Sequence, residues 1–571
     1  MSSLDLAEPD KWHCSANASW PDEVRAANKN SVQQLHKKQA GSGSKCFFLA
    51  LISCHPVSTE LSCNHGNPAH RKTQLTQALP GEPMPQKKKE KINFDVIIIG
   101  CGPAGLFAAY HLGEYTGLDV LVIEKGRQSR KRACPISGTQ ECIRCKPCNI
   151  LSGVGGAGLF SDGKLNFIHK LGKTDLTQFM PLSEAKQLIE ETEKIFNRFN
   201  MDGKVFPTDM AKARDIRKNA LKHGLDLLLI KQKHLGSDNL PGHIASMAEY
   251  VKDQGVTFHT SEEVKDITVD NREVTGVTTS RGTYHAPCVI MAPGRVGAEW
   301  VGSLAQRHGL NVSQRGIEVG VRVEVHADIM RDLCQVIYDP TFFIRTNKYD
   351  DQTRTFCTNQ GGFVALENYQ NFVCVNGHAY MDRKSENTNF AFLSKVVLEE
   401  PVTDNHAYGE SIGRLATIIG GGRPILQRFG DLKRGRRSTW NRIRNSFVEP
   451  TMKNVTCGDV AMALPGRIVC NIIEGLEKLN NVVPGVSNEE TLIYAPEIKF
   501  FATQIETSNV LETAIKGLFV AGDGPGVAGN IVSASATGLI PAMEIARRHA
   551  QVRTGTSSRK KSNHLPGPVQ G

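Results

Sequence analysis

The sequence predicts an α/β protein. Three observations favour this class. Strand and helix signals alternate along most of the chain, and a glycine-rich turn joins the first strong strand to the first helix. The composition is that of an ordinary globular protein, with 40% hydrophobic and 22% charged residues. A chain of 571 residues accommodates two to four domains at roughly 100–200 residues each.

The first element pair is a strand followed by a helix, and a second strand comes directly after it. The run FDVIIIG (94–100) is rich in β-branched residues, as expected for a strand buried on both faces. The segment LFAAYHLGEYT (106–116) has helical composition, and LDVLVIE (118–124) predicts a second buried strand. This β-α-β order is typical of an α/β fold.

The turn inside this unit is Gly100-Cys101-Gly102-Pro103-Ala104-Gly105, a G-x-G-x-x-G motif. The first glycine permits a tight turn, the second lets the backbone approach a pyrophosphate, and the third lets the helix pack on the strand. The helix N-terminus adds free N–H groups and a positive dipole end. The motif therefore predicts dinucleotide binding, with an ordinary glycine-rich turn as the alternative.

Glu124 ends the second strand, 19 residues after Gly105. An acid at this place accepts hydrogen bonds from both ribose hydroxyls of an adenosine. Because a carboxylate repels a 2′-phosphate, the site favours FAD or NAD over NADP.

Two later segments favour FAD over NAD. Residues 263–294 read as a strand, an Asp270-Asn271 turn and short strands that lead into an apolar strand ending at Ala292-Pro293-Gly294. In residues 517–548 an apolar strand ends at Gly522-Asp523, and a glycine-rich turn opens a long helix. We expect Asp523 to hold a ribityl hydroxyl, and the helix N-terminus to offset negative charge on a reduced flavin ring.

On these motifs the chain resembles the two-dinucleotide-binding-domain flavoprotein superfamily, and within it the FAD-dependent dehydrogenase family. The matching stretches are GCGPAG (100–105), GVGGAGLFSDGKL (153–165), VIMAPGRVGAEW (289–300), GVRVE (320–324), RTFC (354–357), VNGHAY (375–380) and GLFVAGDGPGVAG (517–529). They spread over about residues 92–550. The resemblance implies a FAD-dependent oxidoreductase with a Rossmann-like FAD/NAD(P)-binding domain. It implies no particular substrate.

The resemblance also implies roles by position. The three glycines of the first turn meet the pyrophosphate, Glu124 the adenosine ribose, and Asp523 the ribityl or pyrophosphate part, while Val264 matches a backbone position that contacts adenine. The full set of expected cofactor-binding residues is Gly100, Gly102, Pro103, Ala104, Gly105, Glu124, Lys125, Gly155, Gly156, Ser161, Val264, Ala292, Gly294, Gly522, Asp523, Ala528, Asn530 and Ile531.

A glycine-rich stretch, residues 153–164, follows the first β-α-β unit. In the resembling flavoproteins a loop in this region runs beside the flavin ring, where glycines let the backbone approach. We expect Lys164 and Asp162 to be the catalytic residues, because either one can tune the flavin potential or relay a proton. The alternative is a structural turn with a surface lysine.

Four cysteines, Cys134, Cys142, Cys145 and Cys148, form a cluster with two-residue spacing between the last three. Thiolates at this spacing hold zinc or an iron–sulfur cluster, or form a redox disulfide. A four-cysteine zinc site usually has two well-separated pairs, which this cluster lacks. We expect no metal here, although metal binding, thiol redox chemistry and ordinary loop cysteines all remain open interpretations.

The predicted organisation is discontinuous. Residues 1–91 form a disordered leader and 552–571 a disordered tail. The FAD-binding domain comprises residues 92–305 and 501–551, and a mixed α+β domain of residues 306–500 is inserted between them. This second domain covers the flavin and shapes a substrate pocket. Side chains that could face this pocket are Arg322, Arg354, His378 and Arg383, and a structural role is the favoured interpretation of each.

Charge argues against nucleic acid as a partner. The formal net charge is +10, but residues 1–91 hold 12 Lys and Arg against 8 Asp and Glu, and residues 551–571 add four more basic residues. The run LKRGRRS (432–438) is interpreted as a solvated loop rather than an anion patch. An FAD protein that binds or modifies RNA, and an electron carrier linked to the cysteine cluster, are kept as alternatives.

We expect a cytoplasmic protein without a membrane anchor, because the start has no apolar signal region and the 15 cysteines are an odd number. The expected partner is a small-molecule substrate or an electron-transfer protein. The segment TIIGGGRP (417–424) looks like a strand and a glycine turn, but it lacks the third glycine, so we expect no NAD(P)H site there. NAD(P)H stays open as an electron donor that binds without its own Rossmann domain.

Overall fold

The computed structural model describes residues 91–135, 143, 145–161, 163–172, 174–236, 239–313, 316–369, 371–380, 383–398, 404–500 and 504–561, with side chains as far as residue 551. The chain divides into two units, Met1–Lys87 and Lys88–Gly571, and every described residue belongs to the second. The predicted leader therefore lies outside the described residues, apart from Lys91.

A five-stranded parallel sheet forms the core of the dinucleotide domain, the part of the chain around the predicted motif. Its strands, in spatial order, are β25 (Leu518–Val520), β13 (Cys288–Met291), β1 (Val96–Ile99), β2 (Val120–Glu124) and β9 (Thr257–Thr260). All four residues of β1 are buried, because the strand lies at the centre of the sheet with helices on its faces. The predicted β-α-β unit is confirmed.

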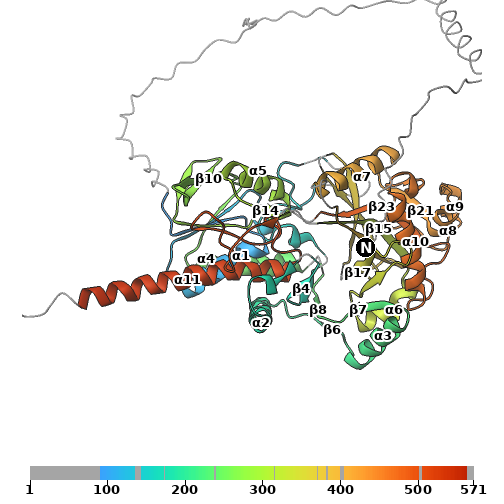
Figure 1. Cartoon of the computed structure of the whole chain (residues 1–571), viewed down its shortest axis with the longest axis horizontal. Helices are drawn as coiled ribbons and strands as arrows, with labels where there is room; N and C mark the ends of the chain where they lie inside the picture. The colour runs from blue at the N-terminus through green and yellow to red at the C-terminus, as the bar shows by residue number, and fades with distance from the viewer. Residues whose placement is uncertain are drawn as a thin grey trace, which may run out of the picture. The chain divides into compact units, whose positions relative to one another are not determined.

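Helix α1 (Pro103–Tyr115) packs along α11 (Ile531–Lys561), so the first and last segments of this domain lie side by side (Figure 1). A Cβ atom at Gly538 would lie 2.0 Å from the Ala104 carbonyl oxygen, so only glycine permits this helix contact. Helix α11 extends to Lys561, so it includes the first ten residues of the segment 552–571 that we expected to be a disordered tail.

The predicted short strands before the apolar strand β13 are also present. They form the antiparallel sheet of β10 (Val264–Asp270), β11 (Glu273–Thr279) and β12 (Thr283–His285). Asn271 and Arg272, between β10 and β11, both have positive φ, at 49° and 64°. Those angles are the ones a tight hairpin turn requires, which explains the Asp270-Asn271 signal.

The second domain is built on an eight-stranded sheet. Its strands, in spatial order, are β22 (Thr456–Cys457), β21 (Ile425–Arg428), β23 (Leu492–Lys499), β15 (Ile317–His326), β20 (Asn387–Val396), β17 (Gln352–Asn359), β16 (Thr341–Arg345) and β7 (Leu225–Leu228). In Figure 1, β15, β17 and β23 lie on the opposite side of the described unit from α1, α11 and β10. β15 contains the stretch GVRVE (320–324), one of those that carry the family resemblance.

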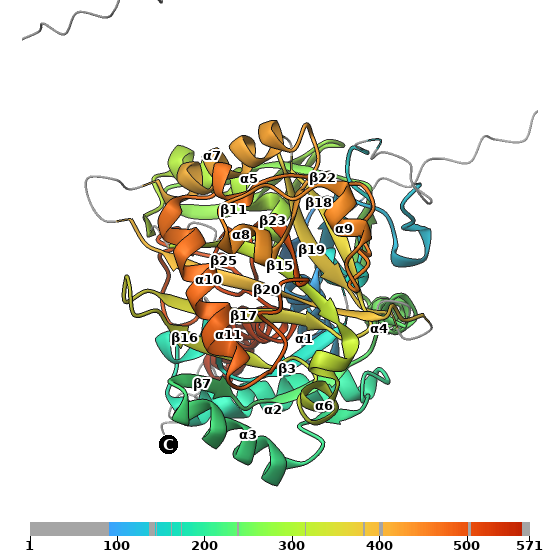
Figure 2. The ribbon, with the colours of Figure 1, turned by 90° about the vertical axis from the view of Figure 1, so that its right-hand side faces the viewer.

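The two faces of β15 differ in chemistry. Alternate residues Val319, Val321, Val323 and Val325 belong to the apolar core of this domain, together with helices α7 (Asn405–Ile419) and α10 (Gly466–Asn480). Figure 2 shows α10 lying across the strands of this sheet. The other face carries Glu318, Arg322 and Glu324, all buried. A buried polar face is costly unless its groups are paired, so it marks a built network.

The sheet also recruits β7, which comes from the segment assigned to the FAD-binding domain. β7 pairs antiparallel with β16, and Leu225 and Leu227 join the second core with Ala213 and Ala220 of α3 (Met210–Lys222). The boundary expected at residue 305 does not anticipate this strand, because its partner lies more than 100 residues further along the chain.

A small sheet of β3 (Lys164–Phe167), β8 (Lys231–His234) and β6 (Val205–Phe206) lies beside α2 (Leu182–Arg198) and follows the glycine-rich stretch. Within the described residues, no helix combines the length and apolar character needed to cross a bilayer.

The segment 417–424, which we expected to be a strand and a glycine turn, has a different structure. Thr417 to Ile419 end helix α7, and Gly421 and Gly422 have positive φ in the turn that follows. Glycine at this place terminates the helix, so the segment is a helix end rather than a strand and turn.

Candidate cofactor site

The carboxyl ends of the parallel strands gather the predicted cofactor motifs. Strand order reverses between β1 and β13, because β2 and β9 lie to one side of β1 while β13 and β25 lie to the other. Ligands of open parallel sheets bind at such a switch point, outside the carboxyl ends of the strands. Gly100 follows β1, and Ala292 follows β13. Glu124 is the last residue of β2, and Lys125 comes directly after it. Gly522 lies in the turn after β25.

Glycines at this edge are fixed by close backbone contacts. Gly100 has φ +94°, and its Cβ would lie 2.3 Å from the Ala292 carbonyl oxygen. A Cβ at Gly105 would lie 2.0 Å from the Gly100 oxygen, and one at Gly156 2.9 Å from the Gly102 Cα. At Gly102 a Cβ would meet only the Gly156 Cα at 3.7 Å, so space remains in front of this turn.

These features fit the pyrophosphate part of FAD. The turn from Gly100 to Gly105 leads into α1, whose first turn presents N–H groups and the positive end of the helix dipole. Gly102 and Pro103 at the helix start, with Gly155 and Gly156 facing them, would hold this part of the cofactor.

Glu124 has a structural role that the motif alone does not reveal. Its Oε2 accepts a hydrogen bond from the Cys101 N–H at 2.8 Å, and its Oε1 accepts from the Gly126 and Gly153 N–H groups at 2.8 and 2.9 Å. The carboxylate is 6% exposed. It therefore ties the dinucleotide turn to the glycine-rich stretch. Its bond to ribose stays a prediction.

Arg132 is a functional residue that sequence reasoning missed. Its guanidinium donates to the carbonyl oxygens of Asn149, Ile150, Gly153, Val154 and Gly156, at 2.6 to 3.3 Å. Burial lowers the pKa of Arg132 to about 10. This side chain fixes the shape of the stretch that contacts Gly102. In the sequence Arg132 is one of several basic residues in the run 127–132, 21 residues before Gly153, and no local pattern distinguishes it from its neighbours.

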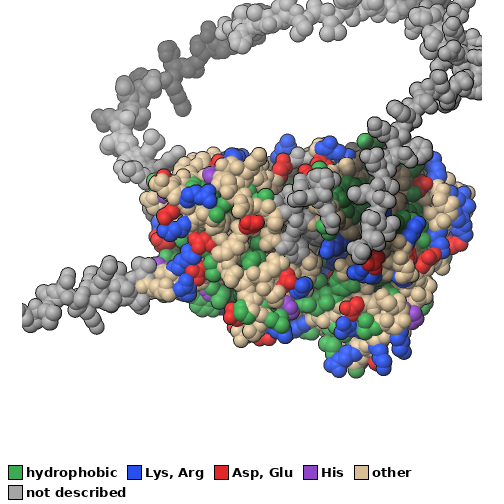
Figure 3. Space-filling view, viewed as in Figure 1, with side chains coloured by type: hydrophobic (Ala, Val, Ile, Leu, Met, Phe, Trp, Pro, Cys, Tyr) green, Lys and Arg blue, Asp and Glu red, His purple; other side chains and the backbone are tan. Residues whose placement is uncertain are grey.

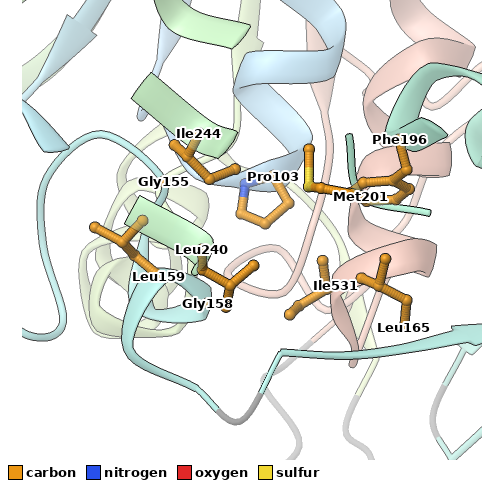
Figure 4. A pocket seen from close by; sticks show the side chains of 10 residues that line it. All are labelled: Pro103, Gly155, Gly158, Leu159, Leu165, Phe196, Met201, Leu240, Ile244 and Ile531. Atoms are coloured by element: carbon orange, nitrogen blue, oxygen red, sulfur yellow. The ribbon is translucent and has the colours of Figure 1, made fainter. Parts of the chain in front are cut away.

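A small apolar cavity of about 20 Å³ lies where the glycine-rich stretch meets the helix starts. Figure 4 shows Pro103, Gly155 and Ile531 converging on it from α1, the loop and α11. Ser161 closes the end of the same loop, since its hydroxyl donates to the Gly158 oxygen at 2.7 Å. Pro103, Gly155 and Ile531 are therefore brought together as expected.

The motif at residues 517–529 lies at the same carboxyl edge of the parallel sheet as the turns after β1 and β13. A Cβ at Gly524 would lie 2.6 Å from the Gly294 oxygen, so the turns after β13 and β25 touch. The Ala528 N–H donates to the Gly522 oxygen at 3.0 Å, and the Asn530 side chain accepts from the Ser533 N–H at 2.9 Å, capping α11.

Asp523 forms an ion pair with Arg295, with 3.0 Å between Oδ2 and Nε. The carboxylate raises the pKa of Arg295, and Tyr369 and Glu367 of the second domain add to the effect, against the opposing effect of burial. The Arg295 side chain is 45% exposed. The two second-domain groups that act on it belong to strand β18 (Phe363–Asn368) and to the residue after it.

Lys164, one of the two expected catalytic residues, is buried against the second domain. Its Nζ lies 3.6 Å from the Asp339 Oδ2 and donates to the Thr358 carbonyl oxygen. It also lies 3.7 Å from the Cys357 Sγ. The surface-lysine alternative is therefore wrong, since the side chain is 6% exposed. Asp162, the other expected residue, lies outside the described residues.

Arg322 and Arg354 are buried in ion pairs rather than turned toward a pocket. Arg322 is fully buried and donates to both Glu497 oxygens at 2.7 and 2.8 Å. Arg354 makes the same two-bond contact with Glu318, at 2.6 Å for each bond. Such bidentate pairs are strong and geometrically specific. Lys499 lies 2.9 Å from Glu497 and adds a second cation.

The other candidates are Val264, Arg383 and His378. Val264 is buried at the start of β10, and Arg383 is exposed and stacks on Tyr380. His378 ends β19 (Val373–His378) and is half-buried. Adenine contact by Val264 stays a prediction.

Within the described residues, no three His, Cys, Asp or Glu side chains converge as metal ligands. Cys134 is exposed, Cys145 and Cys148 are half-buried, and Cys142 lies outside the described residues.

The basic run 432–438 is partly neutralised. Lys433, Arg434 and Arg436 pair with Glu477, Glu489 and Asp431 respectively. Figure 3 shows Lys and Arg side chains at the end of the molecule that carries α8 (Phe429–Lys433) and α9 (Trp440–Arg444), with acidic side chains beside them.

Comparisons with known proteins agree with this site. The FAD binding domain model matches residues 95–389, and a model described as FAD-dependent protein, C-terminal domain-like, matches residues 317–499. The Glucose inhibited division protein A model matches residues 462–553. A protein of Clostridium beijerinckii described as uncharacterized is 23% identical over 477 residues, which cover 79% of this chain and 80% of that protein.

The matches to solved structures are distant in sequence. L-proline dehydrogenase from P. horikoshii is 12% identical with a TM-score of 0.36, covering 80% of this chain and 95% of that chain. Glycine oxidase from Geobacillus kaustophilus is 14% identical with a TM-score of 0.34, at 80% and 95% coverage. Quinol fumarate reductase FrdA of E. coli is 12% identical with a TM-score of 0.38, at 84% and 77% coverage.

Proposed function

The chain belongs to the FAD binding domain family, and on this premise we propose that its FAD-dependent oxidoreductase activity acts on a small organic molecule held between its five-stranded and its eight-stranded sheet. Bound FAD supplies hydride or electron transfer at its ring, while the protein binds, orients and shields the reactants. The observation that carries the proposal is the convergence of the turns after β1, β13 and β25 at one sheet edge.

The chain's own residues divide the task. Gly102, Gly156 and the start of α1 form the part suited to a pyrophosphate, and Glu124 and Arg132 hold these turns in place. The N-terminus of α11, capped by Asn530, presents a positive dipole end toward the same edge. Burial of these groups excludes water from the turns they hold.

Residues around Arg295 are the best candidates for orienting the substrate. Arg295 is the most exposed member of a polar group that includes Asp523, Glu367 and Tyr369. Ligand sites in proteins are often found at domain interfaces that carry a few placed polar groups. Lys164, at the same junction, is proposed to hold or move a proton at its Nζ, next to the Asp339 carboxylate.

An organic donor is proposed in preference to NAD(P)H. Among the described residues, the strand–turn–helix form of G-x-G-x-x-G occurs once, at residues 100–105, and the glycines at 420–422 follow a helix instead. A second dinucleotide would therefore need a site without this fingerprint.

The test is anaerobic absorbance spectroscopy of the purified full chain. Addition of NADH, and then of NADPH, should leave the flavin band unchanged, while a mixed panel of amino acids and hydroxy acids at millimolar concentration is screened for bleaching. Bleaching by either nucleotide within seconds would replace the proposed donor with a pyridine nucleotide.

We also propose a cytoplasmic location and no nucleic-acid or membrane partner. The ten cysteines of the described part are all thiols, as is usual in a reducing compartment. The acidic partners of the 432–438 run reduce its attraction for a polyanion. Cell fractionation and a filter-binding assay with total RNA test both statements. Recovery in the membrane fraction or salt-sensitive RNA retention would contradict them.

A further inference from the structure

Two buried amide side chains in the second domain lack hydrogen-bond partners on one side. Asn359 and Asn389 are both 0% exposed. The Asn359 Nδ2 donates to the Cys357 carbonyl oxygen at 2.9 Å and lies 3.4 Å from the Asn389 Oδ1. Their other amide atoms, the Asn359 Oδ1 and the Asn389 Nδ2, have no partner among the described residues. A buried polar atom without a hydrogen-bond partner costs free energy, and two such atoms side by side in sequence-distant strands indicate a site for a ligand group.

The two atoms without partners are complementary. One is an acceptor and the other is a donor, and both belong to side chains that already contact each other. A hydroxyl group can serve both atoms, because its O–H donates to the acceptor and its oxygen accepts from the donor. A hydroxyl or hydroperoxyl oxygen has these properties.

The Cys357 sulfur lies next to this amide pair. Its Sγ is 3.8 Å from the Asn359 Nδ2, and the residue is half-buried. Cys357 has φ +52°, in the left-handed region, within an irregularity of β17. Its carbonyl oxygen is held there by Arg322 Nη1 at 2.9 Å as well as by Asn359. Such backbone strain persists only where the surroundings fix it, and it clusters at functional sites.

Arg322 is committed to this arrangement. Its remaining donors contact Glu497, Asn376 and Asn389. A Cβ at Gly377 would lie 2.8 Å from the Arg322 Nη1 and 2.2 Å from the Asn359 Nδ2, so the hairpin of β18 and β19 closes tightly over the network. The fold therefore holds Cys357 rigidly.

Lys164 supplies a positive charge to the same sulfur. Its ammonium lies 3.7 Å from the Cys357 Sγ, and the lysine side chain is 6% exposed while Cys357 is half-buried. A nearby cation favours the thiolate, which is the nucleophilic form of cysteine. Among the other described cysteines, Cys101, Cys334 and Cys374 are buried. Cys470 is half-buried and lies 3.5 Å from the Lys348 Nζ, but within the described part of the chain no orphan amide atom belongs to a residue that contacts its sulfur.

We propose that Cys357 is a site of oxidation by hydrogen peroxide and small hydroperoxides. The thiolate sulfur attacks one peroxide oxygen, an S–O bond forms and the O–O bond breaks. Sulfur loses two electrons, the peroxide gains them, and the second oxygen leaves as hydroxide, which takes a proton from solvent. The resulting S–O–H group donates to the Asn359 Oδ1 and accepts from the Asn389 Nδ2. The inference does not depend on the proposed function.

The experiment uses the purified full chain, hydrogen peroxide, and dimedone as a trap for sulfenic acid, followed by peptide mass spectrometry. Cys134 is exposed and serves as the internal reference thiol. We expect the Cys357 peptide to be trapped at least about 10-fold faster than the Cys134 peptide. Trapping of Cys357 no faster than Cys134 would overturn the proposal.

Variants separate the role of the amide pair from that of simple exposure. Asn389→Ala removes the orphan donor but also the Oδ1 contact to Arg322, so its folding is checked by circular dichroism. In the folded variant, the sulfenic acid at Cys357 should remain available to dimedone for a shorter time than in the wild type. Labelling of Cys134 should stay unchanged. An unchanged lifetime would contradict the ligand role of the amides. The wild-type comparison stands even where the variant does not fold.

Discussion

The Lys164 ammonium lies 3.6 Å from the Asp339 carboxylate, and both side chains are about 95% buried. Lys164 begins β3, directly after the glycine-rich stretch that contacts Gly102, whereas Asp339 precedes β16 of the second sheet. The Asp339 Oδ1 also accepts from the Thr358 N–H at 2.7 Å. One ion pair therefore joins β3, which follows the glycine-rich stretch, to the second domain.

Breaking this pair should destabilise the protein strongly. Lys164→Met leaves the Asp339 carboxylate buried without its cation, and we expect the free energy of unfolding to fall by about 3–5 kcal/mol. Urea denaturation followed by tryptophan fluorescence measures the change. The control is Lys170→Met, at a lysine that pairs with Asp175 and whose side chain is 67% exposed. This change should cost about 1 kcal/mol or less. Equal effects of both variants would contradict the role given to the buried pair.

Gly156→Ala should abolish FAD retention. Its φ is +61°, and the new Cβ would lie 2.9 Å from the Gly102 Cα, so the glycine-rich stretch must move away from the dinucleotide turn. The flavin content of the purified variant is the measurement. Gly224→Ala is the matched control, because Gly224 also has positive φ, +77°, but its Cβ would meet nothing within 4 Å. Flavin loss in both variants would assign the effect to backbone strain instead.

Glu124→Gln should weaken FAD binding without changing side-chain volume. The carboxylate accepts three backbone hydrogen bonds, and charged hydrogen bonds contribute about 1.5–3 kcal/mol each. We expect a loss of affinity of about 10- to 100-fold, which equals about 1.4–2.8 kcal/mol. Titration of the deflavinated protein with FAD gives the affinity. Glu273→Gln, at an exposed ion pair with Lys516, should leave the FAD affinity unchanged. Wild-type FAD affinity in Glu124→Gln would refute the role of Glu124 in holding the two turns together.

Glu324 should make stability fall as pH rises. Burial raises the pKa of this carboxyl above its ordinary 4.5, although hydrogen bonds from Thr451 and Tyr494 oppose the shift. Because the folded state binds this proton more tightly than the unfolded state, its contribution is complete below pH 4.5 and is lost as pH rises through the raised value.

Glu324→Gln removes that dependence. The variant should gain stability relative to wild type between pH 5 and 8, by about 1.4 kcal/mol for each unit of the shift within this window. Urea midpoints at several pH values test this. Glu449→Gln, at an exposed glutamate whose pKa is lowered by its hydrogen bond to Lys453, should show no such gain. A constant difference between Glu324→Gln and wild type would show that the carboxyl is not responsible.

The sequence predicted best those elements that local patterns determine. The continuous apolar run at 96–99 and the G-x-G-x-x-G after it identify β1 and α1, and the Asp270-Asn271 turn identifies the hairpin before β13. These signals act within a few residues, so they survive in a single sequence.

Features set by contacts between distant segments were not predictable. Arg322 and Glu497 are 175 residues apart, Lys164 and Thr358 are 194 apart, and β7 pairs with a strand more than 100 residues later. Glu124 was interpreted from its motif position alone, and its three backbone partners appear only once β2 lies beside the glycine-rich stretch. Tertiary packing decides such roles.

The absorbance spectrum of the purified full chain tests the central claim most directly. The account predicts a yellow protein with flavin bands at about 370 and 450 nm and release of FAD on denaturation. A colourless protein that gains no such bands after incubation with excess FAD would contradict it.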